Sequence, residues 1–219
     1  MFMHRAAFIF VVIALVGGAA RARAQIPGMP VWNSPRGGSR LFFAADAGYP
    51  DSIGGKGSVY AVRAAAGFSG LTVSATAGSR SPSAGSSFGE YGGTVAYRLV
   101  GGSLIPVAVN LQGGAAFWSE SGRADNRYTG AVGISVDVPV PYVTLEPWVA
   151  PGVRLNRTGA SGTTPAHSDT EFGWAAGITF GFGAFGVHTA YNYEKLPSGY
   201  HTSTLGIGVH VDIRPALGL

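Results

Sequence analysis

Three residues in the second half of the sequence have side chains that can bind a metal ion. His167, Asp169 and Glu171 lie two residues apart, and imidazole and carboxylate groups at this spacing could converge on a cation. The surrounding segment is rich in Gly, Ser, Thr and Pro, which favours a simpler interpretation in which the three are solvated loop residues. We therefore expect neither a metal site nor a cofactor.

A second set of ionisable side chains shares one face of the elements described below. It comprises Arg40, Asp46, Arg63, Arg98, Asp137, Glu146, Arg154, His188, Glu194, His210 and Asp212. Charges of both signs in a narrow space are costly unless they pair. The set could therefore form structural ion pairs, which is the interpretation we favour, or line a small polar pathway with weak charge selectivity.

The elements that would position these residues follow a period of two. In residues 172–182, Phe172, Trp174 and Ile178 share one parity, while Gly, Ala and Thr occupy the other. Similar alternation recurs along the chain from residue 40, and no stretch shows a sustained helical period. A period of two indicates β-strands with two unlike faces.

Ten such segments are separated alternately by tight turns and by longer polar loops. They span residues 40–49, 58–68, 71–79, 90–99, 103–118, 127–138, 142–156, 171–182, 185–194 and 201–213. Their typical length suits a tilted transmembrane strand of about 9–11 residues. The longer loops are expected at 50–57, 80–89, 119–126, 157–170 and 195–200. This pattern predicts an all-β, antiparallel up-and-down transmembrane barrel of about ten strands, with eight as the alternative.

Charge and residue size indicate which face of the barrel is outside. Only 12% of the residues are Asp, Glu, Lys or Arg, about half the share of a soluble domain. A soluble barrel shows charges to water, whereas the face opposite the large residues here is mainly Gly, Ala, Ser and Thr. We therefore expect the large apolar face to meet lipid and the small polar face to line a lumen. There, Asp46 would lie level with Arg63, and Arg40 would meet Asp212 where the first and last strands close the barrel.

Aromatic positions support the same orientation. Tyr49, Tyr60, Tyr91, Phe117, Tyr128, Phe172, Trp174, Tyr191 and Tyr193 lie toward the long-loop ends of their segments, and Phe68, Tyr142, Phe180, Phe182 and Phe185 lie toward the short-turn ends. Strands favour aromatic residues in general, so only this bias toward the ends is informative. Two girdles are typical of the two interfaces of a bilayer.

The N-terminal residues predict export. Residues 1–24 combine a basic start, a short apolar stretch and the Ala22-Arg23-Ala24 site of a signal peptide. Cleavage there would remove three arginines, so the 15 basic side chains fall to 12 against 11 acidic ones. No basic cluster remains for nucleic acid. Cysteine is absent, which excludes a disulfide scaffold, and the composition is not that of a disordered chain. We expect residues 25–38 to be a flexible periplasmic lead-in and 39–219 to form the barrel.

The chain resembles small outer-membrane β-barrels of the opacity, OmpX and OmpA-barrel type. The resemblance lies in the signal peptide, the meander and segments such as GGTVAY at 92–97 and LGIGV at 205–209. Two features depart from it. Members usually finish on a terminal aromatic residue, whereas this chain runs past Ile213 to Leu219. Pro147 and Pro151 also interrupt one segment, which indicates either a bulge or different strand boundaries.

One short segment suggests a catalytic role, through its resemblance to a family of barrel enzymes. His201-Thr202-Ser203 is similar to the His-x-Ser element of barrel lipid A deacylases, in which a nearby Glu orients the His. No Glu follows Ser203, and Asp212 lies on the inward parity at the opposite end. The paired acids of omptin-type proteases are also absent as a cluster. We therefore expect no catalytic residues.

Taken together, the sequence favours a non-enzymatic, monomeric outer-membrane barrel with an envelope-structural or surface-interaction role. A narrow small-solute or ion pore and a barrel enzyme acting on lipid A are the alternatives. The expected partners are outer-membrane lipid and lipopolysaccharide, the barrel-assembly machinery during insertion and an extracellular ligand at the long loops. Nucleic acid is not among them.

Overall fold

The computed structural model describes residues 26–30, 34–37, 40–102 and 104–213. The predicted signal peptide and the last six residues therefore lie outside the described part. Within that part, no helix is long and apolar enough to span a membrane.

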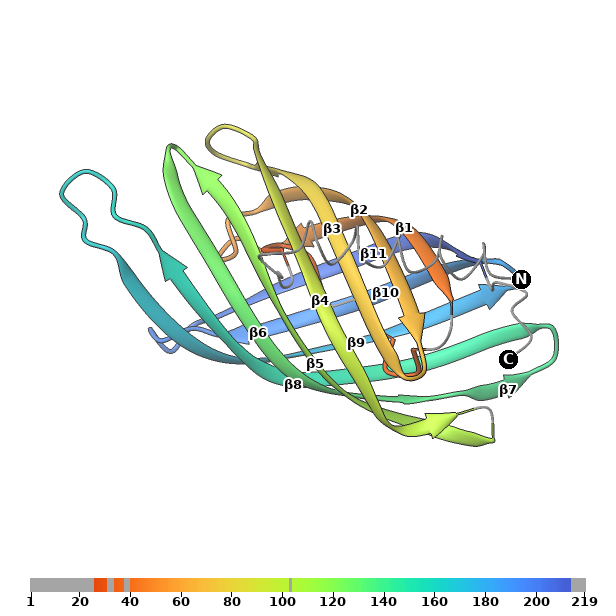
Figure 1. Ribbon diagram of the computed structural model, residues 1–219. Helices are drawn as coiled ribbons and strands as arrows, with labels where there is room; N and C mark the ends of the chain where they lie inside the picture. The colour runs from red at the N-terminus through yellow and green to blue at the C-terminus, as the bar shows by residue number, and fades with distance from the viewer. Residues whose placement is uncertain (1–25, 31–33, 38–39, 103, 214–219) are drawn as a thin grey trace, which may run out of the picture.

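The described chain is almost entirely β-structure (Figure 1). The strands are β1 (Leu41–Pro50), β2 (Gly57–Phe68), β3 (Leu71–Pro82), β4 (Phe88–Gly102), β5 (Ile105–Glu120), β6 (Arg123–Val136), β7 (Val138–Val140), β8 (Val143–Thr158), β9 (His167–Phe182), β10 (Phe185–Lys195) and β11 (His201–Ile213).

All strand pairs are antiparallel, and the sheet closes on itself. Consecutive strands pair from β1 to β6 and from β8 to β11, while β1 pairs with β11 and β6 pairs with β8. The short strand β7 continues β6 past Asp137 and pairs with β8 in the same register. The eleven strands therefore fill ten positions, which confirms the predicted ten-strand meander over the predicted alternative of eight.

The loops at one end are shorter than expected. The predicted loop 119–126 is a two-residue turn, because β5 and β6 remain paired as far as Glu120 and Arg123. Ser121 and Gly122 both have positive φ, 51° and 80°, as a two-residue hairpin turn of type I′ requires. The predicted loop 157–170 likewise shortens to residues 159–166, and the hairpins extend well beyond the rest of the barrel (Figure 1).

Pro147 and Pro151 neither shift the register of β8 nor end the strand. The pairing of β8 with β9 is continuous, and the pairing with β6 keeps one register on both sides of each proline. The ladder to β6 lacks only the pairs at and next to the prolines, because a proline has no N–H to donate. Both interpretations offered by the sequence are therefore wrong for β8. The register shifts lie instead between β4 and β5, after Arg98.

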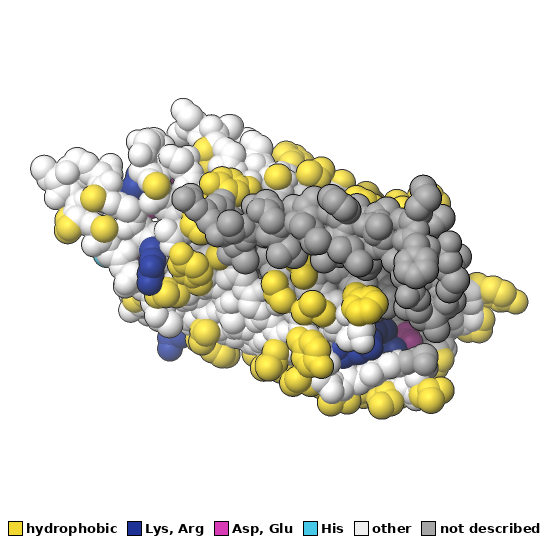
Figure 2. Space-filling view, in the orientation of Figure 1, with side chains coloured by type: hydrophobic (Ala, Val, Ile, Leu, Met, Phe, Trp, Pro, Cys, Tyr) yellow, Lys and Arg dark blue, Asp and Glu magenta, His cyan; other side chains and the backbone are white. Residues whose placement is uncertain are grey.

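The two faces of the barrel have opposite chemistry. Outward side chains such as Val62, Leu205, Ile207 and Val209 are 55–64% exposed, whereas the inward parity carries the buried charges. The visible outer wall is mainly apolar or uncharged, with few charged side chains (Figure 2). Exposed aromatic residues occur toward both ends, among them Tyr60 and Tyr91 near the long loops and Phe182 and Phe185 near the short turns.

The segment before β1 lies inside the barrel. Ile26 and Met29 are 1% and 2% exposed and pack with Val59, Ala61 and Ala116, all from strands of the wall. Further along, Pro35 lies against Gly133, where a Cβ atom would be 3.0 Å from the proline ring. In its described residues, the segment expected to be a lead-in packs inside the lumen. Glycines and alanines on the inward face leave the room that it occupies.

Candidate functional site: the polar lumen

The most deeply buried part of the site joins four strands near the middle of the barrel. The carboxylate of Asp46 (β1), whose side chain is fully buried, lies 3.4 Å from Nε of Arg63 (β2) and 2.9 Å from Nε2 of His188 (β10). The Nδ1 atoms of His188 and His210 (β11) lie 3.0 Å apart. The alternation of the strands brings these residues together, since each has inward parity.

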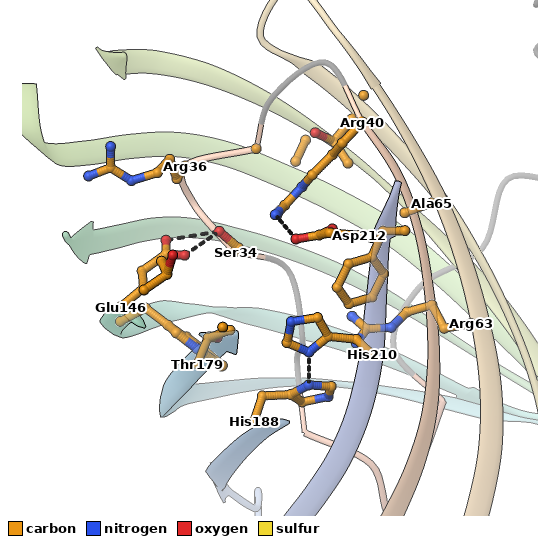
Figure 3. A pocket seen from close by; sticks show the side chains of 18 of the residues that line it. Ser34, Arg36, Arg40, Arg63, Ala65, Glu146, Thr179, His188, His210 and Asp212 are labelled. Atoms are coloured by element: carbon orange, nitrogen blue, oxygen red, sulfur yellow. Dashed lines mark hydrogen bonds and ion pairs between the residues drawn. The ribbon is translucent and has the colours of Figure 1, made fainter. Parts of the chain in front are cut away.

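A second ion pair closes the barrel between its first and last strands. Nη1 of Arg40 donates to Oδ2 of Asp212 at 2.8 Å. The Arg40 and Arg63 guanidinium groups lie 5.6 and 5.0 Å from the centre of the Phe42 ring. Phe42 also stacks on His210, with ring centres 5.0 Å apart. The Phe42 ring thus packs beside both guanidinium groups and His210. Figure 3 shows Arg40, Asp212, Arg63 and His210 close to one another.

The lumenal segment before β1 adds further contacts near the short turns. Ser34 donates to the carboxylate of Glu146, at 2.8 and 2.9 Å from its two oxygens. Arg36 donates to the carbonyls of Gly102 and Pro106, and its Nη1 lies 3.5 Å from Oδ2 of Asp137. Arg98 in turn donates to the carbonyl of Arg36 at 2.8 Å.

A polar cavity of about 240 Å³ lies between these groups. Its walls include Ser34, Arg40, Glu146, His188 and Asp212 (Figure 3). Of its charged side chains, Arg40 and Asp212 pair with each other, whereas Glu146 accepts from Ser34 and Arg63 lies against Asp46, outside the lining. A lining with charges of both signs can hold water or small ions.

A separate cluster occupies the long-loop half of the lumen. Glu194, which is 3% exposed, lies 3.3 Å from Nε of Arg154 and 3.0 Å from Nη1 of Arg127. Asn192 bridges the cluster by accepting from Arg154 and donating to Glu194. Buried charges are tolerated when they pair and are hydrogen-bonded in this way.

The inward residues named by the sequence thus fall into three groups rather than one. Asp46, Arg63, His188 and His210 meet in the middle, together with Arg40 and Asp212. Glu146 contacts Ser34 of the lumenal segment, and Asp137 and Arg98 contact Arg36. Arg154 lies with Glu194 in the cluster of the long-loop half. The alternation of the strands could have identified Arg127 and Asn192 as further inward residues. Nothing in the sequence pattern points to Ser34 or Arg36.

The metal interpretation receives no support from the described residues. They contain no group of three or more His, Cys, Asp or Glu placed to hold a metal ion. His167 and Asp169 lie 3.5 Å apart, with side chains 54% and 41% exposed, while Glu171 accepts from Asn156 at 2.8 Å. The three residues belong to β9 and not to the loop that the sequence predicted.

The structure brings an acid to Ser203 from the other end of the sequence. Oγ of Ser203 donates to Oδ2 of Asp51 at 2.9 Å, and the Ser203 amide donates to the same oxygen at 2.7 Å. His201 instead stacks on Tyr193, with ring centres 5.2 Å apart. Burial acts to raise the pKa of Asp51, but hydrogen bonds from Gly54, Ser203 and Thr202 outweigh it and lower this pKa. Asp51 is therefore a loop anchor with a stabilised negative charge.

No family model matches the chain, and no curated protein matches it. Solved structures similar to it include Neisserial surface protein A, with 12% identity, a TM-score of 0.40 and coverage of 78% of this chain and 96% of that one. The N-terminal β-barrel domain of Pseudomonas aeruginosa OprF has 12% identity, a TM-score of 0.39 and coverage of 80% and 98%. The outer membrane enzyme PagL has 8% identity, a TM-score of 0.42 and coverage of 78% and 98%. The closed antiparallel barrel in the present structure has the architecture that the sequence resemblance predicted.

Proposed function

We propose that this chain is a non-enzymatic integral protein of the outer membrane, with its long loops outside the cell in an envelope-structural or surface-interaction role. The observation that carries the proposal is the inverted polarity of the barrel. Charged side chains such as Asp46 and Glu194 are buried in the lumen, whereas Val62 and Ile207 are more than half exposed on the outside. An apolar outer face and a polar interior are stable in a bilayer, whereas in water the outer face would be exposed to solvent.

Closure of the sheet supports the same location. Hydrocarbon cannot hydrogen-bond to the free edge of a sheet, and the pairs β1–β11 and β6–β8 leave no free edge in the described part of the sheet. The short turn at Pro141–Tyr142 exposes Tyr142 completely. In the proposed orientation this turn lies in the periplasm, and the outer loops meet lipopolysaccharide and any extracellular ligand.

The contacts of Ser203 favour a non-enzymatic role. A serine nucleophile needs a base to take its proton, most often an imidazole. Here the hydroxyl hydrogen of Ser203 is directed to Asp51, and the ring of His201 is stacked on Tyr193. Expression of the wild-type chain should therefore leave the lipid A mass spectrum of the host unchanged. Loss of acyl chains that disappears with Ser203→Ala would establish the enzyme instead.

Cysteine labelling tests the location and the orientation together, because the chain has no native cysteine. Ser161→Cys places a thiol in the long loop between β8 and β9, and Tyr142→Cys places one at the opposite end. A membrane-impermeant maleimide should label Cys at 161 on intact cells and Cys at 142 only after permeabilisation. Heat-modifiable migration in detergent gels would show that both variants are folded. The reverse labelling, or recovery of the protein in the soluble fraction, would contradict the proposal.

A further inference from the structure

We propose that residues 26–30 and 34–37 form a displaceable plug, and that the lumen conducts small inorganic ions when this plug leaves. Gated ion passage is a separate function from the surface role proposed above. The plug, as defined by these two described stretches, reaches from the Ile26 contacts on β2 to the Arg36 contacts at the turn between β4 and β5.

The plug is not part of the sheet. None of its described residues pairs with a strand, and its backbone hydrogen bonds include two within itself, from Met29 to Ile26 and from Gly37 to Ser34. The side chains of Ser34 and Arg36 make polar contacts with the wall, and Arg98 donates one hydrogen bond to a plug carbonyl. The plug can therefore leave without breaking a single pair of the barrel ladder.

The wall has space shaped for the plug. Gly48 faces the carbonyl of Gly28 in close contact, and a Cβ atom at Gly48 would also lie 3.1 Å from Sδ of Met29. A Cβ atom at Gly78 would lie 3.1 Å from Cδ1 of Ile26. An eight-strand barrel is just filled by its own side chains. Ten strand positions with glycines on the inward face leave room for an additional segment, and hence for a channel without it.

Polar groups of the wall beside the plug are left without hydrogen bonds. Both carboxylate oxygens of Glu90 and both amide atoms of Gln112 are buried without a hydrogen-bond partner in the described structure. Glu90 lies between Gly78 and Trp118 on the neighbouring strands, and Ile26 and Met29 pack against these positions. A Cβ atom at Gly133 would meet both Gln112 and Pro35.

These groups give the open state a physical advantage. Arg80 and Arg127 attract Glu90 electrostatically, but a buried carboxylate or amide without a hydrogen-bond partner still costs free energy that hydration recovers. Water entering behind the departing plug would solvate Glu90 and Gln112 and would fill a lumen that already contains charges of both signs. Small ions are the solutes that fit, because general porins with wide channels need 16–18 strands.

A reversible lock tests the proposal with the full chain. Ser34→Cys combined with Glu146→Cys places two thiols across a plug-to-wall contact in a protein that has no other cysteine. Because the Glu146 side chain is longer than a cysteine, a short bifunctional methanethiosulfonate closes the gap and joins the two thiols through disulfides that a reductant cleaves. In planar bilayers in KCl, across a range of voltages, the reduced protein should show discrete openings. The cross-linked protein should lose them, and reductant should restore them. Ser74→Cys with Thr94→Cys is the matched control, because it joins two adjacent wall residues, 2.6 Å apart at their hydroxyls, and should leave the openings unchanged.

A second variant loosens the plug. Arg36→Ala removes the contacts with Gly102, Pro106 and Asp137, and should raise the fraction of time spent open at least several-fold. Heat-modifiable migration identifies folded protein in each case. Silent bilayers with folded Arg36→Ala, or equal conductance of the cross-linked and reduced double-cysteine protein, would overturn the proposal and leave the proposed surface role untouched.

Discussion

The imidazole of His188 (β10) donates a hydrogen bond to the carboxylate of Asp46 (β1) over Gly208 of the intervening strand β11, with Nε2 and Oδ1 2.9 Å apart. A carboxylate can only accept, so Nε2 of His188 carries the hydrogen. Nδ1 of a neutral His188 then accepts from Nδ1–H of His210, 3.0 Å away. Arg63 completes the arrangement from the other side of Asp46, at 3.4 Å. One buried carboxylate thus organises side chains from β2, β10 and β11.

Removal of Asp46 from this arrangement should be costly. Asp46→Ala leaves the Arg63 guanidinium buried without its counter-charge, and breaking a buried pair in this way typically costs about 3–5 kcal/mol. Urea unfolding of the protein in lipid or detergent measures the loss. Asp212→Ala is the control. The side chains of the Arg40–Asp212 pair are 25% and 16% exposed, so this variant should lose less unfolding free energy than Asp46→Ala. Equal losses in the two variants would show that burial does not determine how much these ion pairs stabilise the barrel.

The loop between β1 and β2 should loosen in acid. Because hydrogen bonds lower the pKa of Asp51 in the folded protein, its carboxylate contributes stability above the unfolded pKa, near 3.8, that is lost as the pH falls through the folded pKa. A spin label at Ile53→Cys should therefore become more mobile below about pH 3.8. The same label in Asp51→Asn should be mobile at neutral pH and nearly insensitive to acid. Acid-dependent mobility that persists in Asp51→Asn would assign the effect to another group.

The barrel was predictable from the sequence because its signal is local. Each strand alternates, so parity alone places Asp46, Arg63 and His210 on one face. The ends of the hairpins were less predictable, since polar side chains at positions such as Arg123 and Asp125 suit a loop and an exposed strand equally. Their pairing depends on the turn at Ser121–Gly122.

The lumenal segment could not be predicted on the same basis. Pro27, Pro30 and Pro35 exclude a strand, and a segment without periodicity is typical of a linker. Its position depends on space left by glycines 20–100 residues away, among them Gly48 and Gly133. The contact between Asp51 and Ser203 was missed for a related reason, because barrel closure brings the two ends of the chain together.

Pro147 and Pro151 allow a direct test of the seam between β6 and β8. The missing pairs place the ring nitrogens toward β6, where an N–H at position 151 would meet the carbonyl of Val132. In Pro151→Ala the new amide should be protected from hydrogen exchange by NMR, because it regains a ladder partner. The exchange rate of the new amide in Pro50→Ala, at the end of β1, is measured for comparison. Free exchange of the amide at 151 would show that the proline does not face β6.

The tryptophans can separate the outside of the barrel from its lumen. Trp174 has the outward parity of β9, stacks on Tyr193 and makes a tilted contact with Tyr191 near the long loops. Trp148 is 6% exposed and packs inside with Ala150, Ala175 and Ala190. Variants that retain only one of these two, with the remaining tryptophans changed to Phe, give a single fluorescence signal each. Brominated lipid quenches only indoles that contact its chains, so it should quench Trp174 strongly and Trp148 little. Stronger quenching of Trp148 would mean that the polarity of the barrel is the reverse of the one in this structure, and the proposed membrane location would fail with it.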